Sequence, residues 1–332
     1  METYQIVLLV FAAAAALAAA AAALIYFNLP KIFAVKTASA FDNGQLKKPP
    51  RYEECARQVR RLKNLRYPSS LPNNRCDLYL PAEESEAPLP VIFWIHGGGF
   101  TAGTKDGTEI LCTMLCSEGF AVVSADYAYA PRHKFPSVAR QIGEAVNFLT
   151  ALKKDYPRLD LDRVIVGGDS AGGHYCAQYA AAHTNPAYAA ELGIKTAPVR
   201  VKGAILCCAP LDIATMLPPA NFKLKLLADT FFNGYFGFAP RRKKRGKALS
   251  DISAFVTSDF PPAFITDGNT FSFEAQNKNF ARSLAEAGVR TEEVFFDKEN
   301  RGVVNHEYLF ELDTEIAAEG YVRLTSFLRS LT

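Results

Sequence analysis

The feature that most constrains how this chain can fold is the segment Gly168-Asp169-Ser170-Ala171-Gly172, which joins a short apolar run to a helix of small residues. The apolar run at 164–168 predicts a buried strand, and a helix is predicted from residue 171 onward. Glycine is needed at both ends of such a turn because a Cβ would clash there, and the turn exposes the hydroxyl of its central serine. The motif therefore predicts an α/β chain with Ser170 as a nucleophile.

Apolar runs and helical patterns alternate along most of the chain. Further strands are predicted at 75–81, 90–96, 120–127, 199–208, 262–266 and 294–297. The spacing of apolar residues predicts helices at 137–154, 273–287 and 316–331. This alternation predicts a mostly parallel sheet covered by helices on both faces, and a length of 332 residues fits one such domain.

The residues Ile6–Phe27 form a run without any charge, rich in alanine. As a helix this run would span about 33 Å, enough for the apolar core of a bilayer. A cleaved signal peptide is the alternative, but the run is long for one and no Lys or Arg precedes it. By the positive-inside rule, the bases after the run predict a single-pass anchor with the remaining chain in the cytoplasm. These bases are Lys31, Lys36, Lys47, Lys48 and Arg51.

The alternation of strands and helices is interrupted between residues 213 and 255. The stretch has no strand pattern and carries bulky apolar side chains, so we interpret 214–254 as a helical cap over the sheet. The predicted organisation is an anchor over 1–30, a membrane-proximal linker with cap helices over 31–72, and a catalytic domain over 73–332 that contains the cap. Four cap aromatics would either line a substrate pocket or pack the cap itself: Phe231, Phe232, Tyr235 and Phe236.

A second motif, His96-Gly97-Gly98-Gly99-Phe100, follows directly on an apolar run. A tri-glycine turn can direct backbone N–H groups at one point, and each such donor stabilises the oxyanion of a tetrahedral intermediate by roughly 3–4 kcal/mol. Gly98, Gly99 and Ala171 are the candidate donors of this oxyanion hole. A plain glycine turn or a phosphate loop is the alternative, but the Gly-Lys-Ser/Thr ending of a phosphate loop is missing.

The two motifs together resemble those of the hormone-sensitive lipase family of α/β-hydrolases. The resemblance extends to Asp126-Tyr127-Ala128-Tyr129-Ala130-Pro131, since that family has a similar D-Y-x-x-A-P segment before its next helix. It covers the chain from about residue 75 onward. The resemblance implies an α/β-hydrolase fold with an eight-stranded sheet and a helical cap, no cofactor, and carboxylesterase activity on small acyl esters.

A nucleophilic serine of this kind needs a histidine base and an acid that follow it in the chain. His306 is the histidine that comes after the last predicted strand, so it is the predicted base. The acid is expected after the strand at 262–266, where family members place an aspartate close to the position of Asn269. Asp267 is the first candidate, and Glu274 and Asp212 remain alternatives.

Charge and cysteine content narrow the range of partners. The net charge is only +3, so no global attraction to nucleic acid is expected. The number of cysteines is odd and most lie in apolar patterns, which favours free thiols in a reducing compartment, although a Cys55–Cys76 bridge stays open. The pair Cys112 and Cys116 has no nearby ligand partners, so no metal site is predicted.

One concentrated charge cluster, Arg241-Arg242-Lys243-Lys244-Arg245, lies within the predicted cap. It is either a solvated loop or a contact with anionic lipid headgroups, to which each base would contribute about 1 kcal/mol. The second interpretation suits an anchored enzyme whose ester substrate is lipid-like. An amidase or peptidase with the same machinery, and a non-catalytic binding protein on the same scaffold, are the alternative functions. The sequence leaves the acyl chain length and the oligomeric state open.

Overall fold

The structure of the chain is a computed structural model that describes residues 2–41, 47–83, 85–218 and 220–332. Its strands are β1 (Val59–Arg66), β2 (Arg75–Pro81), β3 (Leu89–Ile95), β4 (Ala121–Ala125), β5 (Leu159–Asp169), β6 (Val201–Cys207), β7 (Ala263–Asp267) and β8 (Thr291–Phe295). Its α-helices are α1 (Thr3–Phe41), α2 (Tyr52–Arg57), α3 (Glu109–Ser117), α4 (Ser137–Asn147), α5 (Leu149–Asp155), α6 (Ala171–Thr184), α7 (Pro186–Leu192), α8 (Phe222–Tyr235), α9 (Pro240–Leu249), α10 (Glu274–Glu286), α11 (Lys298–Arg301) and α12 (Glu315–Arg329). Short 3₁₀ helices are η1 (Lys105–Thr108), η2 (Ile252–Phe255) and η3 (Tyr308–Phe310).

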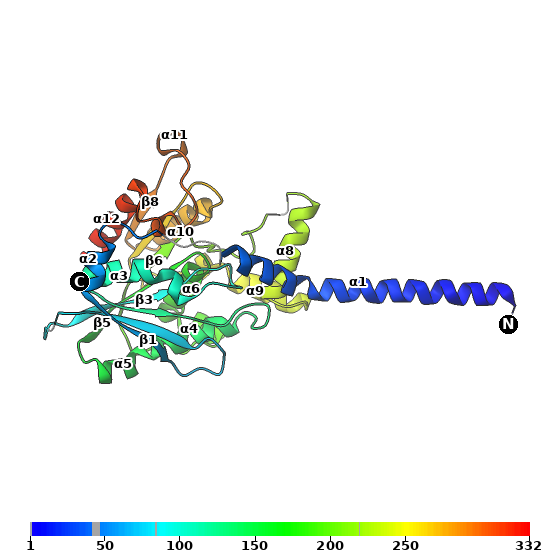
Figure 1. Cartoon of the computed structure of the whole chain (residues 1–332), viewed down its shortest axis with the longest axis horizontal. Helices are drawn as coiled ribbons and strands as arrows, with labels where there is room; N and C mark the ends of the chain where they lie inside the picture. The colour runs from blue at the N-terminus through cyan, green and yellow to red at the C-terminus, as the bar shows by residue number, and fades with distance from the viewer. Residues whose placement is uncertain (1, 42–46, 84, 219) are drawn as a thin grey trace.

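The strands form one eight-stranded sheet in the order β1-β2-β4-β3-β5-β6-β7-β8. The pairs β1–β2 and β2–β4 are antiparallel, and all pairs from β4 to β8 are parallel. The carboxyl ends of β3, β5, β6 and β7 therefore lie along one edge, where ligand sites of such sheets form. The predicted α/β-hydrolase fold with eight strands is confirmed, and Figure 1 shows the sheet among its covering helices.

Each face of the sheet carries its own hydrophobic layer, because successive side chains of a strand point to opposite faces. In β3, Phe93 belongs to the layer formed with α4, α6 and α10, whereas Trp94 belongs to the layer formed with α3 and α12. In β5, Val166 belongs to the layer with α4, α6 and α10, and Ile165 belongs to the layer with α3 and α12. Both faces are buried, which is why these strands read as continuous apolar runs.

Strand β1 is the strand that the sequence pattern does not predict. Its sequence, VRRLKNLR, carries four basic side chains, and it lies at an edge of the sheet, where charges discourage further pairing. Arg61 of this strand forms ion pairs with Asp77, Asp106 and Glu109. The expectation of only a linker and cap helices over 31–72 is therefore wrong in this part, which contributes an edge strand.

Helix α1 is long and apolar enough to cross a membrane, a property that it shares with signal sequences. It continues through Pro30 to Phe41, past the predicted end of the anchor at residue 30, and its first part projects from the domain (Figure 1). Its later part packs on α8, where Asn233 Nδ2 donates to Tyr26 Oη (3.1 Å) and the rings of Phe33 and Phe231 lie 6.3 Å apart. The apolar helix and the cap are therefore in direct contact.

The described part of the predicted cap contains α8 and α9. The basic run 241–245 lies on α9, so the expectation of a loop is wrong. The cap aromatics are buried; Phe231 and Tyr235 stack on one another and pack against Phe100, with ring centroids 5.9 and 4.8 Å from it. These contacts show that the cap aromatics pack the cap against the tri-glycine loop.

The helix predicted over 137–154 is two helices, α4 and α5, which meet at Phe148.

Replacing Ile205 with alanine should lower the free energy of unfolding by about 2–5 kcal/mol, because it opens a cavity in the layer with α3 and α12. Ile205 is a fully buried residue of β6 in that layer. Urea unfolding followed by circular dichroism measures the loss. The control Val322→Ala truncates a side chain of α12 that is 61% exposed and should change the value by at most about 0.5 kcal/mol. Equal losses in the two variants would contradict the description of this layer.

Candidate active site

Ser170 stands at the junction of β5, which ends at Asp169, and α6, which begins at Ala171. Its backbone angles, φ 48° and ψ −117°, are rare for a residue with a side chain and indicate local strain. Close packing imposes the turn. A Cβ on Gly168 would lie 2.5 Å from the carbonyl carbon of Gly172, and a Cβ on Gly172 would lie 1.9 Å from the carbonyl oxygen of Ile95. The clash predicted from the sequence is found at both glycines.

His306 approaches Ser170 from the loop after β8. Its Nε2 lies 3.0 Å from Ser170 Oγ, which is hydrogen-bonding distance. The His306 backbone N–H donates to the carbonyl oxygen of Thr270 (3.2 Å), and the ring of Phe273 packs edge-on against the imidazole with centroids 5.4 Å apart. The structure thus brings together two predicted site residues that lie 136 positions apart in the chain.

Asp267, the last residue of β7, faces the other side of the imidazole. Its Oδ1 lies 3.4 Å from His306 Nδ1, and its side chain is fully buried. Its Oδ2 accepts hydrogen bonds from the backbone N–H of Phe273 (2.8 Å) and from Asn277 Nδ2 (3.2 Å). These two donors fix the orientation of the carboxyl group. The first candidate for the acid is therefore in place behind His306.

The alternative acids have other partners. Glu274 forms an ion pair with Lys278 (2.5 Å) one turn further along α10. Asp212 bonds the N–H of Ala214 (2.8 Å) and the hydroxyl of Thr215 (2.8 Å) within its own turn. Asn269, near the position where the family has its aspartate, donates to the carbonyl oxygens of residues 296 and 302 and so holds the loop that carries His306.

The histidines differ in their pKa values according to their surroundings. Burial lowers the pKa of His306, but the contact of its Nδ1 with Asp267 and the negative charge of the neighbouring acidic groups outweigh this effect, so the pKa lies above the usual 6.5. Burial lowers the pKa of His96 and of His174 to about 4, so both stay neutral at neutral pH. His306 is thus the one of these three histidines whose surroundings favour its protonated form.

The tri-glycine loop (residues 96–100) lies at the end of β3 beside this arrangement. Gly98 and Gly99 have φ angles of 122° and 58°, and a Cβ on Gly98 would lie 2.1 Å from the carbonyl oxygen of Ala102. His96 Nδ1 donates to the carbonyl oxygen of Gly97 (2.6 Å), and its ring stacks on Tyr127 at 4.3 Å. His96 is therefore a structural residue of the loop.

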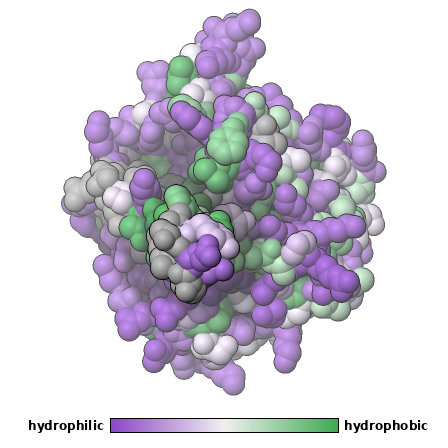
Figure 2. Space-filling model, turned by 90° about the vertical axis from the view of Figure 1, so that its right-hand side faces the viewer, coloured by the Kyte–Doolittle hydropathy of each residue, from purple (hydrophilic) through white to green (hydrophobic). Residues whose placement is uncertain are grey.

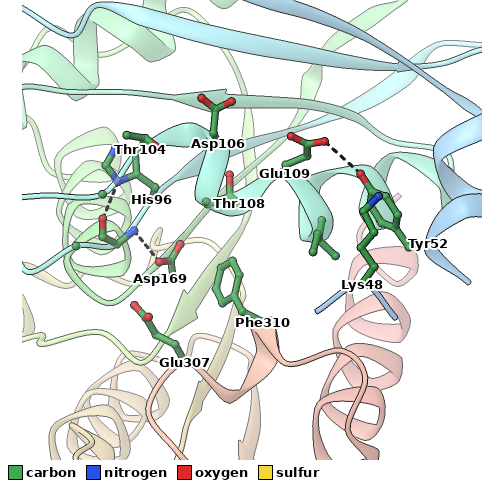
Figure 3. A pocket seen from close by; sticks show the side chains of 15 residues that line it. Lys48, Tyr52, His96, Thr104, Asp106, Thr108, Glu109, Asp169, Glu307 and Phe310 are labelled. Carbon is green, nitrogen blue, oxygen red and sulfur yellow. Dashed lines mark hydrogen bonds between the residues drawn. The ribbon is translucent and has the colours of Figure 1, made fainter. Parts of the chain in front are cut away.

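A cavity of about 610 Å³ opens beside the tri-glycine loop. Figure 3 shows Asp169 and Glu307 at one end of it and Glu109, Tyr52 and Lys48 at the other. The tri-glycine loop contributes Gly97 and Gly98 to its wall. The cavity thus connects the back of the tri-glycine loop with α2.

Cys208, Asp267 and His306 place atoms of the metal-ligand type within 4.8 Å of one another. The two ring nitrogens of His306 already face Ser170 and Asp267. Burial raises the pKa of the Cys208 thiol well above its usual value, so the thiol keeps its proton. The contacts of His306 with Ser170 and Asp267 are those of a serine–histidine–acid arrangement.

All seven cysteines are free thiols, so Cys55 and Cys76 do not form the bridge that the sequence left open.

Sequence reasoning did not single out Asn277 and Glu307. No motif marks Asn277, which supports Asp267 from the first turns of α10. Glu307 follows His306 directly, and an acidic neighbour of a predicted base is a signal that could have identified it. Asp169 has a structural role, since it accepts hydrogen bonds from Trp94 Nε1 and from the N–H of Gly97.

The pKa of His306 tests which carboxyl group faces it. In Asp267→Asn the carboxylate charge that faces His306 Nδ1 and raises its pKa is lost while burial remains, so the pKa should fall. In the control Glu274→Gln it should stay unchanged, because Glu274 pairs with Lys278. An NMR titration of the imidazole protons gives both values. A fall in the control, or none in Asp267→Asn, would assign the acid elsewhere.

Comparison with known proteins places the chain among named esterases. The family model described as BD-FAE matches residues 76–275, more than half of the chain. An esterase of Gibberella moniliformis is 29% identical over 185 residues, which are 54% of this chain and 56% of the relative. Carboxylic ester hydrolase LipN of Mycobacterium tuberculosis is 33% identical over 113 residues, 30% of each chain. The chain thus aligns with about half of the first relative and less of the second.

Solved structures show the same fold. Esterase B from Lactobacillus rhamnosis has a TM-score of 0.75 at 19% identity, with 91% of this chain and 96% of that chain covered. A bacterial heroin esterase has a TM-score of 0.64 at 22% identity, with 83% and 86% covered. The resemblance to the hormone-sensitive lipase group is confirmed by these findings. With the family model matching most of the sheet and the turn at Ser170, the chain belongs to the BD-FAE family of α/β-hydrolases.

Proposed function

We propose that the chain hydrolyses carboxylic esters through an acyl-enzyme formed at Ser170. The observation that carries the proposal is the 3.0 Å contact between Ser170 Oγ and His306 Nε2, with Asp267 on the far side of the imidazole. Relatives with the printed names esterase and carboxylic ester hydrolase support an ester rather than an amide as the scissile group.

The proposed reaction has two halves. His306 Nε2 takes the proton of Ser170 as Oγ attacks the ester carbonyl, and the negative oxygen that forms is stabilised by the backbone N–H groups of Gly98, Gly99 and Ala171. His306 then gives the proton to the departing alcohol, which leaves an acyl group on Ser170. Water, deprotonated by His306, attacks the acyl group and releases the acid.

The charge state of His306 sets the expected pH dependence. The base must be neutral to accept the Ser170 proton, and its pKa is raised above 6.5. Hydrolysis should therefore fall as pH falls through this raised value. Asp267 holds the Nδ1–H toward itself and stabilises the imidazolium that forms.

Ser170→Ala should lose labelling by a fluorophosphonate probe and lose at least about 10³-fold in kcat for p-nitrophenyl esters, because the attacking oxygen is gone. Labelling is read on a gel, and a series of esters with rising acyl length reports the substrate preference. The control is Ser272→Ala, a nearby serine outside the proposed triad, which should label normally. Equal labelling of wild type and Ser170→Ala would refute the proposal.

We further propose that α1 crosses a bilayer and that the enzyme acts on lipid-like esters there. The part of α1 that precedes its contacts with the cap, residues 3–25, would span about 34 Å, close to the thickness of a bilayer core. Exposed apolar side chains such as Phe11 (70%) and Leu17 (72%) have lipid as their natural partner. Because Tyr26 and Phe33 pack against α8, the cap would then lie at the membrane surface.

The cap itself has features that suit a membrane surface. Phe222 at the start of α8 is 80% exposed, and α9 carries the five bases of 241–245. Figure 2 views the face from which α1 projects, with apolar patches beside the helix and mostly hydrophilic surface around them. The bases after the apolar run, Lys31 and Lys36 among them, support a cytoplasmic position of the catalytic domain.

The full chain reconstituted in vesicles should hydrolyse a vesicle-embedded ester faster when anionic lipid is present. In the double variant Arg241→Gln/Lys244→Gln this preference should weaken, because two exposed bases of α9 together contribute about 2 kcal/mol at a lipid surface. The double control Lys154→Gln/Lys195→Gln removes the same charge outside the cap. An undiminished preference in the α9 variant would contradict the contact between α9 and lipid.

A further inference from the structure

Two buried carboxyl groups lie beside the proposed triad without belonging to it. Asp169 directly precedes Ser170, and Glu307 directly follows His306. Figure 3 shows the two side chains near one another at one end of the cavity beside the tri-glycine loop. The segments that carry Ser170 and His306 therefore meet a second time, through these two side chains.

Asp169 is already an acceptor at both oxygens. Its Oδ1 accepts a hydrogen bond from Trp94 Nε1 (2.8 Å), and its Oδ2 accepts one from the backbone N–H of Gly97 (2.6 Å). Two N–H donors favour the ionised form of a carboxyl group. Asp169 is thus placed to accept a further hydrogen bond from the neighbouring carboxyl group.

Glu307 is unusual in both backbone and side chain. Its φ of 61° lies in the left-handed region, which is uncommon for a residue other than glycine and is strained. Its N–H donates to Cys208 Sγ (3.1 Å). Its Oε1 is buried and has no hydrogen-bond partner among the described residues, and it lies close to Asp169 Oδ2 beside Gly97. The strained backbone thus directs the side chain to a second carboxyl group.

Gly97 leaves the space in which the two carboxyl groups meet. A Cβ at this position would lie 2.3 Å from Asp169 Oδ2 and 2.7 Å from Glu307 Oε1. Both oxygens therefore approach the same point of the tri-glycine loop. Two carboxylates at such close range repel one another unless a proton lies between them.

We propose that Glu307 and Asp169 share one proton, with the Glu307 hydroxyl donating to Asp169, and that this bond holds the His306 loop against the tri-glycine loop. The inference rests on the proposed function of Ser170 and His306. Glu307 and Asp169 are positioning residues in it, because they act through the placement of His306 and of the loop that carries the oxyanion donors.

The surroundings favour one negative charge on the pair rather than two. Burial raises the pKa of both Glu307 and Asp169, and a charged Glu307 would raise the pKa of Asp169 further, so the two carboxyl groups are not ionised together. The titratable and charged groups near the pair and along the cavity are His96, Cys207, Cys208, Asp267, His306, Asp106, Glu109, Lys48 and, beyond His96, Lys105. The two thiols keep their protons and His96 stays neutral, so His306 is the group in contact with the pair whose charge changes near neutral pH.

Loss of the shared proton has a defined consequence. Two charged carboxylates would repel, and the His306 loop would lose its link to the tri-glycine loop. Turnover should therefore fall at alkaline pH, separately from the fall at acid pH that comes from protonation of His306.

The test compares two substitutions of Glu307 in the full chain by the pH dependence of kcat. Glu307→Gln keeps an N–H donor for Asp169 but cannot titrate, so kcat near neutral pH should stay within about threefold of wild type and the alkaline fall should vanish. Glu307→Ala removes the link, so kcat should fall by about 10- to 100-fold with a smaller change in KM. Glu311→Gln, which changes an exposed glutamate four positions later, is the control and should match wild type at every pH.

Three results would overturn the proposal: wild-type kcat in Glu307→Ala, equal impairment in both Glu307 variants, or an alkaline fall in kcat that persists in Glu307→Gln.

A measurement that does not depend on turnover separates the link between Glu307 and Asp169 from the proposed function. The infrared spectrum of wild type at neutral pH should contain a protonated-carboxyl band that is lost in Glu307→Gln. Because the folded protein keeps this proton above the pH at which the unfolded chain loses it, stability should fall with rising pH more steeply in wild type than in Glu307→Gln. Normal ester turnover without this band would overturn the link alone, and the band without turnover would overturn the function alone.

Discussion

The close packing of α6 against the end of β3 is the constraint on which the rest of the site depends. Gly172 touches the carbonyl oxygen of Ile95 so tightly that no side chain fits between them, and this contact forces Ser170 into its strained conformation. The same contact places the start of α6 beside the tri-glycine loop, which follows β3. Nucleophile and oxyanion donors are thus positioned by one packing contact, and a relaxed turn at Ser170 would separate them.

Much of this arrangement could be predicted from the sequence because local patterns carry it. The turn at Ser170 combines a strand, two glycines and a helix in consecutive residues, and chain order alone leaves His306 as the base. The strands β3 and β5 read as apolar runs because both faces of the sheet are covered. The features that could be predicted are those that depend on neighbouring residues in the chain, such as the turn at Ser170, or on burial of a strand on both faces of the sheet.

The features that escaped prediction depend on contacts between distant segments. Strand β1 is an edge strand whose charges find partners such as Asp77 on another strand, so its own pattern carries no strand signal. Asp267 and Glu274 are both acidic and lie close to the end of β7, so the sequence could only rank them as candidates for the acid. In the structure Asp267 faces His306, whereas Glu274, at the start of α10, pairs with Lys278. A single sequence contains no record of such orientations.

The position of the acid bears on why a second link would be useful. Asp267 sits on the last residue of β7, whereas Asn269 occupies the loop position where the resembling family has its aspartate. A carboxyl group on the strand is rigid, but it reaches His306 Nδ1 at 3.4 Å, longer than an ideal hydrogen bond. The loop that carries the imidazole is tied through Asn269 on one side. Glu307 lies beside Asp169 on the other side, so the loop approaches the segment that carries Ser170 at a second point besides the contact of His306 with Ser170.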